Sequence, residues 1–192
     1  VIKENIYPEG REHIQNILHY AEILKLAYPE VEICPVQPSD GGICFDYING
    51  TSMEEMYQQC LLKDDIAAME KLIEKHKEIV LGSTENVCDF TVSDDFIKIF
   101  GFDNWNGSQK ALKIANFDAI ASNIIFWEEK PTFIDYEWVY EFPMPIELVI
   151  YHCIRDIYFH VEDLDTFYPL KRAMEYLDIQ TPIEDLEKAY YN

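Results

Sequence analysis

The feature that most constrains the fold is a pair of short apolar segments in the second half of the chain, each with polar residues at fixed places. In the first, Asp118 and Asn123 stand five residues apart in a loop that leads into an apolar stretch. In the second, residues 132–134 lead to Asp135, and Glu137 follows. Phosphoryl transfer uses these residue types, because one carboxylate orients or deprotonates the attacking hydroxyl while an amide and another carboxylate bind magnesium. The alternative is two ordinary hairpin strands with acidic ends.

Composition limits the possible partners. The chain has 192 residues, of which 48% are hydrophobic, and this is enough for one domain or for two closely packed lobes. Its 36 acidic and 15 basic residues give a formal net charge of -21. Such a surface repels nucleic acid and the anionic face of a membrane, so we expect neither as a partner. A nucleotide can still bind where metal ions offset its charge. We also expect no membrane span, because no apolar run is long enough.

The cysteines indicate the redox compartment, and the first residues indicate that the chain is part of a longer polypeptide. The five cysteines form no Cys-x-x-Cys pair, which argues against a structural zinc site, and their odd number favours a reducing, cytoplasmic compartment over a disulfide framework. The chain opens on Val1-Ile2-Lys3, which has the character of the end of a β-strand. We therefore expect a fragment of a longer polypeptide.

Hydrophobic periodicity and turn residues predict the elements. In the first third we expect a helix over 9–27, strands over 31–36 and 43–48, and a helix capped by Thr51 or Ser52. Residues 82–108 are mixed. The other expected helices cover 64–80, 145–160, 166–177 and 182–190, and the other expected strands cover 112–117, 123–127 and 132–135.

The pattern of Asp118, Asn123 and Asp135 resembles the catalytic loop and the metal-binding Asp of protein kinases. It is more similar still to the aminoglycoside- and choline-kinase branch, where the second motif often reads Ile-Asp-Phe-Glu; here it reads Ile134-Asp135-Tyr136-Glu137. The resemblance implies that Asp118 is the catalytic base, that Asn123 and Asp135 are metal ligands with help from Glu137, and that ATP and Mg²⁺ are required.

A second stretch, residues 44–50, resembles the hinge between the lobes of a kinase. By that resemblance the Asp46 carbonyl and the Ile48 amide face the edge of the adenine, and Phe45 lines its pocket. The alternative is a strand that simply ends at Asn49-Gly50.

Lys3 resembles the strand lysine that contacts the α- and β-phosphates of ATP. The helix that follows should then supply a glutamate as its partner. Glu12 is our choice, while Glu9 and Glu22 remain open. The alternative is a solvated lysine.

Several aromatic residues follow Asp135: Tyr136, Trp138, Tyr140 and Phe142. They alternate with smaller or charged residues. They either pack in the core, which we favour, or form a platform for a sugar ring.

The resemblance covers residues 1–160 and implies a fold and two functions. The fold is α+β and kinase-like, with a truncated small lobe and hinge over 1–48 and a mainly helical large lobe over 49–192. Its motifs are similar to those of kinase-like domains attached to bacterial glycosyltransferases and methyltransferases of surface-polysaccharide synthesis. The first function is ATP-dependent phosphorylation of a hydroxyl on a small molecule or bacterial glycan.

The second is a non-catalytic kinase-like module that serves as a scaffold for an attached transferase. Three departures from the family pattern favour it. Asn116-Phe117 replaces the usual His-Gly or His-Arg, Ile120 stands where a lysine is usual, and the sequence shows no Gly-rich loop. A third possibility is a helical interaction domain whose motifs are accidental.

Overall fold

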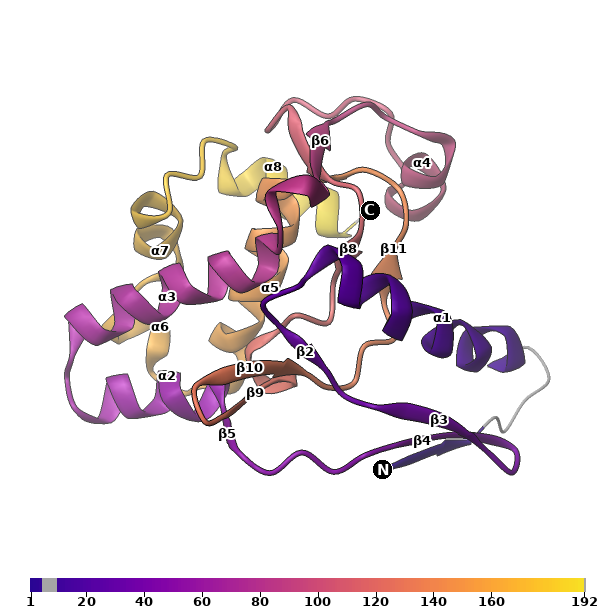
Figure 1. The fold of residues 1–192 in the computed structure, drawn as a ribbon. Helices are drawn as coiled ribbons and strands as arrows, with labels where there is room; N and C mark the ends of the chain where they lie inside the picture. Colours follow the sequence, from indigo (N-terminus) through magenta and orange to yellow (C-terminus); the bar gives the residue numbers. More distant parts are fainter. Residues whose placement is uncertain (5–9, 192) are drawn as a thin grey trace.

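The computed structural model describes residues 1–4 and 10–191, in which short strands and longer helices alternate (Figure 1). The strands are β1 (Ile2–Glu4), β2 (Glu32–Ile33), β3 (Val36–Ser39), β4 (Gly42–Phe45), β5 (Thr51–Ser52), β6 (Val87–Asp89), β7 (Lys110–Leu112), β8 (Ala115–Asn116), β9 (Ile124–Trp127), β10 (Lys130–Phe133), β11 (Val139–Tyr140) and β12 (Met144–Pro145). The α-helices are α1 (Arg11–Ala27), α2 (Met53–Leu62), α3 (Ile66–Leu81), α4 (Asp94–Phe100), α5 (Ile146–His160), α6 (Leu164–Phe167), α7 (Leu170–Tyr176) and α8 (Ile183–Tyr191). Short 3-10 helices cover η2 (Thr84–Asn86) and η3 (Ala121–Asn123). The expected α+β class is confirmed.

The first sheet has the order β1-β4-β3, with both pairs antiparallel. Lys3 lies opposite Ile43 in this register. Ile43 and Phe45 are buried while their neighbours along β4 are more exposed, as expected for a strand with one face on the core. Helix α1 packs on this sheet and buries Ile17 and Leu24. The expected helix over 9–27 is thus observed from Arg11, with Gly10 as its N-cap residue, and position 9 lies outside the described residues.

The strand expected over 31–36 is in fact two strands in two sheets. β2 pairs in parallel with β10 in the sheet β2-β10-β9-β5, with Glu32 opposite Thr132. The chain then passes Pro35 and joins the first sheet as β3. Pro35 has no N–H to donate to a ladder, so a continuous strand is interrupted there. Segment 1–48 therefore supplies all three strands of the first sheet and one strand of the sheet β2-β10-β9-β5.

The strand expected over 43–48 ends earlier, at Phe45. The Asp46 N–H leaves the ladder and donates to the Pro35 carbonyl at 3.0 Å. Residues 46–49 have no regular structure, and β5 begins at Thr51. Ser52 caps α2: it accepts from the Glu55 N–H at 3.1 Å, and Glu55 bonds back to the Ser52 N–H at 2.8 Å.

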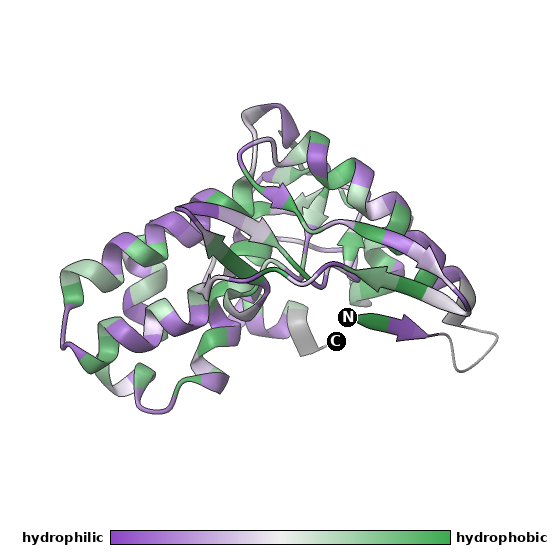
Figure 2. Cartoon of the chain, turned by 60° about the horizontal axis from the view of Figure 1, so that its bottom comes forward, coloured by the Kyte–Doolittle hydropathy of each residue, from purple (hydrophilic) through white to green (hydrophobic). Residues whose placement is uncertain are grey.

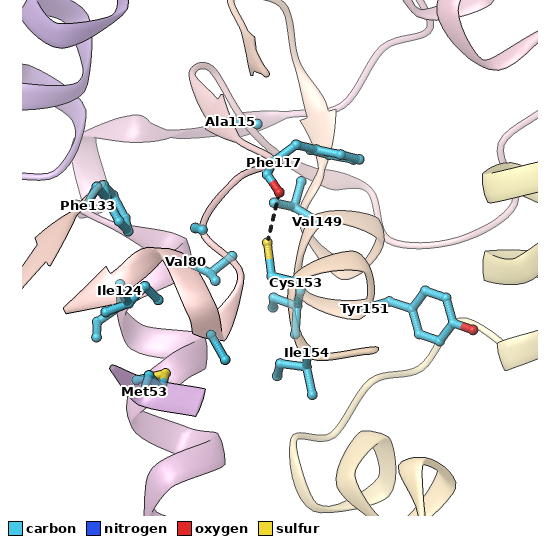
Figure 3. Close-up of a cluster of buried hydrophobic side chains, with 14 of the residues drawn as sticks. Met53, Val80, Ala115, Phe117, Ile124, Phe133, Val149, Tyr151, Cys153 and Ile154 are labelled. Carbon is cyan, nitrogen blue, oxygen red and sulfur yellow. Dashed lines mark hydrogen bonds between the residues drawn. The ribbon is translucent and has the colours of Figure 1, made fainter. Parts of the chain in front are cut away.

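The helical part is built around α5, which packs against α3, α7 and α8 (Figure 1). Leu148, Val149, Ile150 and Tyr151 are consecutive and buried, so α5 is enclosed on most sides. Figure 3 shows Val149, Cys153 and Ile154 facing Phe117 and Val80 across this core. The helix expected over 145–160 is confirmed. The helix expected over 166–177 is interrupted between α6 and α7 by Pro169, which cannot continue a helical hydrogen-bond ladder.

The helix expected over 64–80 is observed as α3, and it has an apolar face. Met69, Leu72, Ile73 and Val80 are buried on α3, but Ile66 is 37% exposed, because it directly follows the capping residue Asp65 at the helix end. Figure 2 shows hydrophilic and hydrophobic stretches alternating along the helices. Of the helices that the structure describes, none has both the length and the apolar character needed to cross a bilayer.

The glycine that ends α3 provides a test of this packing. Gly82 has φ +63° and ψ -140°, and a Cβ added there would lie 2.6 Å from the Ala27 carbonyl oxygen and 2.7 Å from the Tyr28 ring. We expect Gly82→Ala to lower the free energy of unfolding by about 3 kcal/mol or more, because it combines an unfavourable backbone conformation with a steric clash. Gly41→Ala is the matched control: φ is +82° there, but nothing lies within 4 Å of the added atom, so the loss should be about 1 kcal/mol. Urea unfolding of both variants measures the difference, and equal losses would contradict the close approach.

Candidate functional site

Asp118 lies in the loop between β8 and η3, and its carboxylate joins this loop to the segment after β10. The Asp118 N–H donates to Oδ1 of Asn116 at 3.1 Å. Its Oδ2 accepts from the backbone N–H groups of Glu137 and Trp138 at 2.6 and 2.7 Å. The loop and the segment 137–138 are therefore held together by one side chain.

Asn123 and Asp135 lie at the same end of the second sheet. Asn123 ends η3, and its carbonyl accepts from the Ile134 N–H at 2.9 Å. Asp135 follows directly with φ 54°, a left-handed conformation that is uncommon for residues other than glycine. The structure thus places Asp118, Asn123 and Asp135 around the C-terminal end of β10.

Lys3 reaches this group from the first sheet. Its ammonium contacts the carboxylates of both Asp135 and Glu137. The sequence predicts a different partner, Glu12, but Glu12 is exposed on α1, and no ion pair joins it to Lys3 in the described residues. The reason is that the next residue of the helix, His13, is the one that faces the site.

His13 is a residue that the sequence analysis missed. Its Nε2 lies 3.0 Å from Oε2 of Glu137, and its ring lies 5.2 Å from the Trp138 ring. Of the other candidate partners for Lys3, Glu22 pairs with Lys25 at 2.7 Å, and Glu9 lies outside the described residues. The sequence spacing alone gives no signal for His13, because its partner is more than a hundred positions away.

The environment of Asp118 changes its protonation. Burial raises the pKa of this carboxyl from 3.8 to about 6, the bond from the Trp138 N–H opposes the shift, and the nearby charge of Asp135 adds to it. Lys3 and His13 both act to lower the pKa of Asp118. A carboxylate with a pKa near 6 is a stronger base than an ordinary aspartate and remains ionised at neutral pH, which suits general base catalysis.

A small cavity lies where the first sheet meets Asp135. Its volume is about 160 Å³, and its lining includes four of the five residues expected at the nucleotide site, all except Glu12: Lys3, Phe45, Asp46 and Ile48. The expected metal ligand Asp135 lines it as well. Cys34 and Ile134 add apolar surface. The structure therefore brings the predicted hinge, the strand lysine and the second motif together around one cavity.

The backbone groups of the predicted hinge differ in their hydrogen bonding. The Ile48 N–H makes no hydrogen bond to the described part of the chain. The Asp46 carbonyl accepts a weak bond from the Cys34 thiol at 3.4 Å, which leaves one lone pair for another donor. One donor and one acceptor are thus available side by side at the cavity.

A second, larger cavity of about 410 Å³ lies on another side of Asp118. Phe117, Trp138, Tyr140 and His152 line it together with the carboxyl groups of Asp118 and Asp156. Burial also raises the pKa of Asp156, while His160, whose Nδ1 lies 3.2 Å away, opposes the shift. The sequence analysis missed Asp156; its position one helical turn after His152 on the apolar helix is the signal that could have indicated it.

The aromatic residues after Asp135 have different roles. Tyr136 is fully buried, donates to the Cys34 carbonyl at 2.7 Å and packs edge-on against Phe45, as expected for the core. Trp138 is 56% exposed and borders the second cavity with Tyr140. The core interpretation is therefore confirmed for Tyr136 and wrong for Trp138, whose position after the turn at Asp135 directs it outward.

In the residues that the structure describes, no group of three or more His, Cys, Asp and Glu side chains is arranged to hold a metal ion. Asp135 and Glu137 are both engaged by Lys3, whose single positive charge offsets part of their negative charge. Their carboxylates and the Asn123 amide are nevertheless oxygen donors of the kind that magnesium prefers.

The raised pKa of Asp118 predicts a stability change. The folded chain holds this proton more tightly than the unfolded chain, so the stabilisation is present below about pH 4 and is lost as pH rises through about 6. At pH 7 the ionised carboxylate then costs up to about 3 kcal/mol. Asp118→Asn keeps an oxygen for the two N–H groups without the charge, so it should stabilise the fold by up to about this amount at pH 7 and by little at pH 4.

Urea unfolding at both pH values tests this expectation. Asp135→Asn is the control, because it removes a partner of Lys3 and should stabilise at neither pH. An Asp118→Asn variant that is less stable than the original chain at pH 7 would show that the carboxylate charge is needed for folding.

Comparison with known proteins adds no family assignment. No family model matches the sequence, and no curated protein matches it. The arguments for function therefore rest on the two cavities, the residues that line them and the carboxylate between them.

Proposed function

We propose that this chain is a kinase-like phosphotransferase that moves a phosphoryl group from ATP to a hydroxyl of a small molecule or a bacterial glycan. The observation that carries the proposal is the lining of the 160 Å³ cavity by Lys3, the predicted hinge and Asp135, with Asp118 close by on the 410 Å³ cavity. A phosphoryl donor on one side of this group and an acceptor on the other would meet at Asp118. The proposal includes a two-lobed kinase-like fold, with residues 1–48 as a partial small lobe, and a cytoplasmic location.

The small cavity suits the base of a nucleotide. It is smaller than the roughly 300–1,000 Å³ of a typical ligand pocket, so it takes a flat ring system and not a whole nucleotide. Phe45, Ile48 and Ile134 supply apolar surface, while the Asp46 carbonyl and the Ile48 N–H supply one acceptor and one donor. An adenine edge carries the complementary donor and acceptor. The phosphates would then extend toward Lys3 and the exposed Asp135.

The acidic group is the proposed magnesium site. Asp135, Glu137 and Asn123 would hold the ion, which when bound neutralises the charge of the phosphates. The carboxylates already hold a positive charge, that of Lys3, at this position. In the proposed complex Lys3 turns from these carboxylates to the phosphates, and this exchange of partners keeps the charge balanced.

Asp118 is the proposed base. Its Oδ2 is held by two backbone N–H groups, so Oδ1 is the atom that takes the proton of the acceptor hydroxyl while that oxygen forms its bond to phosphorus and the nucleoside diphosphate leaves. The exposed Trp138 offers a flat apolar surface for a sugar ring. Among the described residues, two with carboxyl groups and no lysine or arginine line this cavity, so the acceptor is uncharged or cationic and not anionic.

The second candidate is the non-catalytic scaffold for an attached transferase. The contact of Lys3 with both proposed magnesium ligands supports it, because the acidic group is then neutralised without a metal. Ile120 supports it too, since no cation accompanies Asp118 on its loop.

Nucleotide binding is the first test. Titration calorimetry should show ATP binding with Mg²⁺ and far weaker binding without it, because the acidic surface opposes a free polyphosphate. Asp135→Asn should weaken the metal-dependent binding, whereas Asp156→Asn, in the other cavity, should not. Equal ATP affinity with and without metal would rule out the proposed magnesium ligands.

Turnover is the second test. Asp118→Asn should reduce phosphoryl transfer by about two to four orders of magnitude, the usual contribution of a positioned base, and should leave ATP affinity almost unchanged. The assay offers neutral sugars, amino sugars and uronic acids as acceptors, with hydrolysis as the background, and we expect no transfer to the uronic acids. A folded chain that transfers to none of these acceptors nor to water would support the scaffold instead.

A further inference from the structure

Two imidazole rings hold peptide groups of the loop that carries Asp118, one before this residue and one after it. Nε2 of His152, on α5, lies 3.0 Å from the Phe117 carbonyl oxygen. Nε2 of His76, on α3, lies 2.8 Å from the Ala119 carbonyl oxygen. The residue before Asp118 and the residue after it are therefore each bonded to a different core helix.

Both rings act as donors. A carbonyl oxygen can only accept, so Nε2 carries the hydrogen in each case. Burial lowers the pKa of both histidines to about 4, so each ring is neutral at pH 7 and its Nδ1 has no proton. For His76 the second nitrogen is used as well, because the Tyr57 hydroxyl lies 3.2 Å from its Nδ1 and donates to it. Tyr57 thereby favours the tautomer of His76 that has its hydrogen on Nε2 and donates to the Ala119 carbonyl.

The Phe117 side is held by more than one contact. The His152 ring stacks on the Phe117 ring with a centroid distance of 4.3 Å and an interplanar angle of 20°. The Cys153 thiol lies 3.9 Å from the same carbonyl oxygen, the contact drawn in Figure 3. Helix α5 thus fixes both the ring and the carbonyl of the residue before Asp118.

These contacts determine where the carboxylate points. The orientations of the two flanking peptide planes set the direction of the Cα–Cβ bond of the residue between them. His152 fixes the plane of the peptide between Phe117 and Asp118. His76 fixes the peptide between Ala119 and Ile120, which is next to the one that follows Asp118, so the two imidazoles restrict the backbone on both sides of this residue. We propose that His76 and His152 are positioning residues that aim the Asp118 side chain at its proton-transfer position. This inference rests on the proposed role of Asp118 as the base.

A matched pair of substitutions separates positioning from simple packing. His76→Leu fills a similar volume but has no donor for Ala119. His76→Gln places an amide N–H close to the position of Nε2. His152→Leu and His152→Gln form the same pair on the other side.

Tyr57→Phe removes only the hydroxyl that sets the tautomer, so it tests the same chain of bonds in a variant with nearly unchanged packing. Ile79→Ala, on α3 but facing the cavity beside Tyr28, is the control for general loss of stability.

The first measurement needs no enzymatic activity. Amide hydrogen exchange of residues 117–120 should become about tenfold faster in each Leu variant and should stay near the original rate in each Gln variant. Tyr57→Phe should be intermediate. Ile79→Ala should lower the melting temperature without selectively exposing this loop. Equal exchange in the Leu and Gln variants would overturn the inference, whatever reaction the chain performs.

The second measurement uses transfer from Mg²⁺-ATP to water and to neutral hexoses. His76→Leu should lower kcat by about 100-fold, as expected for a misplaced catalytic group, with the KM for ATP within about twofold, and His76→Gln should restore most of kcat. The double variant His76→Leu with His152→Leu should lose less than the product of the single losses, because both act on one side chain. A parallel change of kcat and KM, or no rescue by Gln, would overturn positioning. If the original chain shows no transfer at all, the proposed function fails, while the exchange rates still decide whether the two histidines hold the loop.

Discussion

The burial of the Asp118 carboxylate is the constraint on which the rest of the site depends. A carboxylate removed from water is costly unless it accepts hydrogen bonds, and here the donors are the N–H groups of Glu137 and Trp138. These groups belong to the segment that follows Asp135. The carboxylate therefore adds to the pairing of β8 with β11 and to the bond from the Phe117 N–H to the Trp138 carbonyl, which hold the same segment against the loop. The same requirement brings Lys3 and His13 close, because both side chains favour the ionised form of Asp118.

Charge is the second organising factor. In a chain of net charge -21, Lys3 contacts Asp135 and Glu137 and also stabilises the ionised form of Asp118. The ammonium of Lys3 thus interacts favourably with three carboxylates, although its strand, β1, lies at the other end of the sequence. This attraction holds the three carboxylates together in the protein alone. In the proposed reaction a phosphate-bound metal would replace Lys3 in this role.

The sequence predicted what depends on local spacing. The helix over 145–160, the cap at Ser52 and the apolar face of α3 are set within a few turns, so periodicity and capping residues were enough to find them. The grouping of Asp118, Asn123 and Asp135 was expected from the resemblance of their motifs to those of kinases. Among the features that the sequence did not predict are the split of segment 31–36 between two sheets and the preference of Lys3 for Asp135 and Glu137 over Glu12. Both are decided by partners about a hundred or more positions away, which one sequence does not reveal.

The pairing of β2 with β10 also has a mechanical consequence. β2 leads through Cys34 and Pro35 directly into the first sheet, and β10 leads directly to Asp135. Tyr136 also joins these two segments, because its hydroxyl donates a hydrogen bond to the Cys34 carbonyl. The first sheet therefore cannot rotate as a rigid body about residues 46–49 while the pairing of β2 with β10 is intact. Because Asp135 itself lines the small cavity, its place there is set by the two short chain segments that follow β2 and β10.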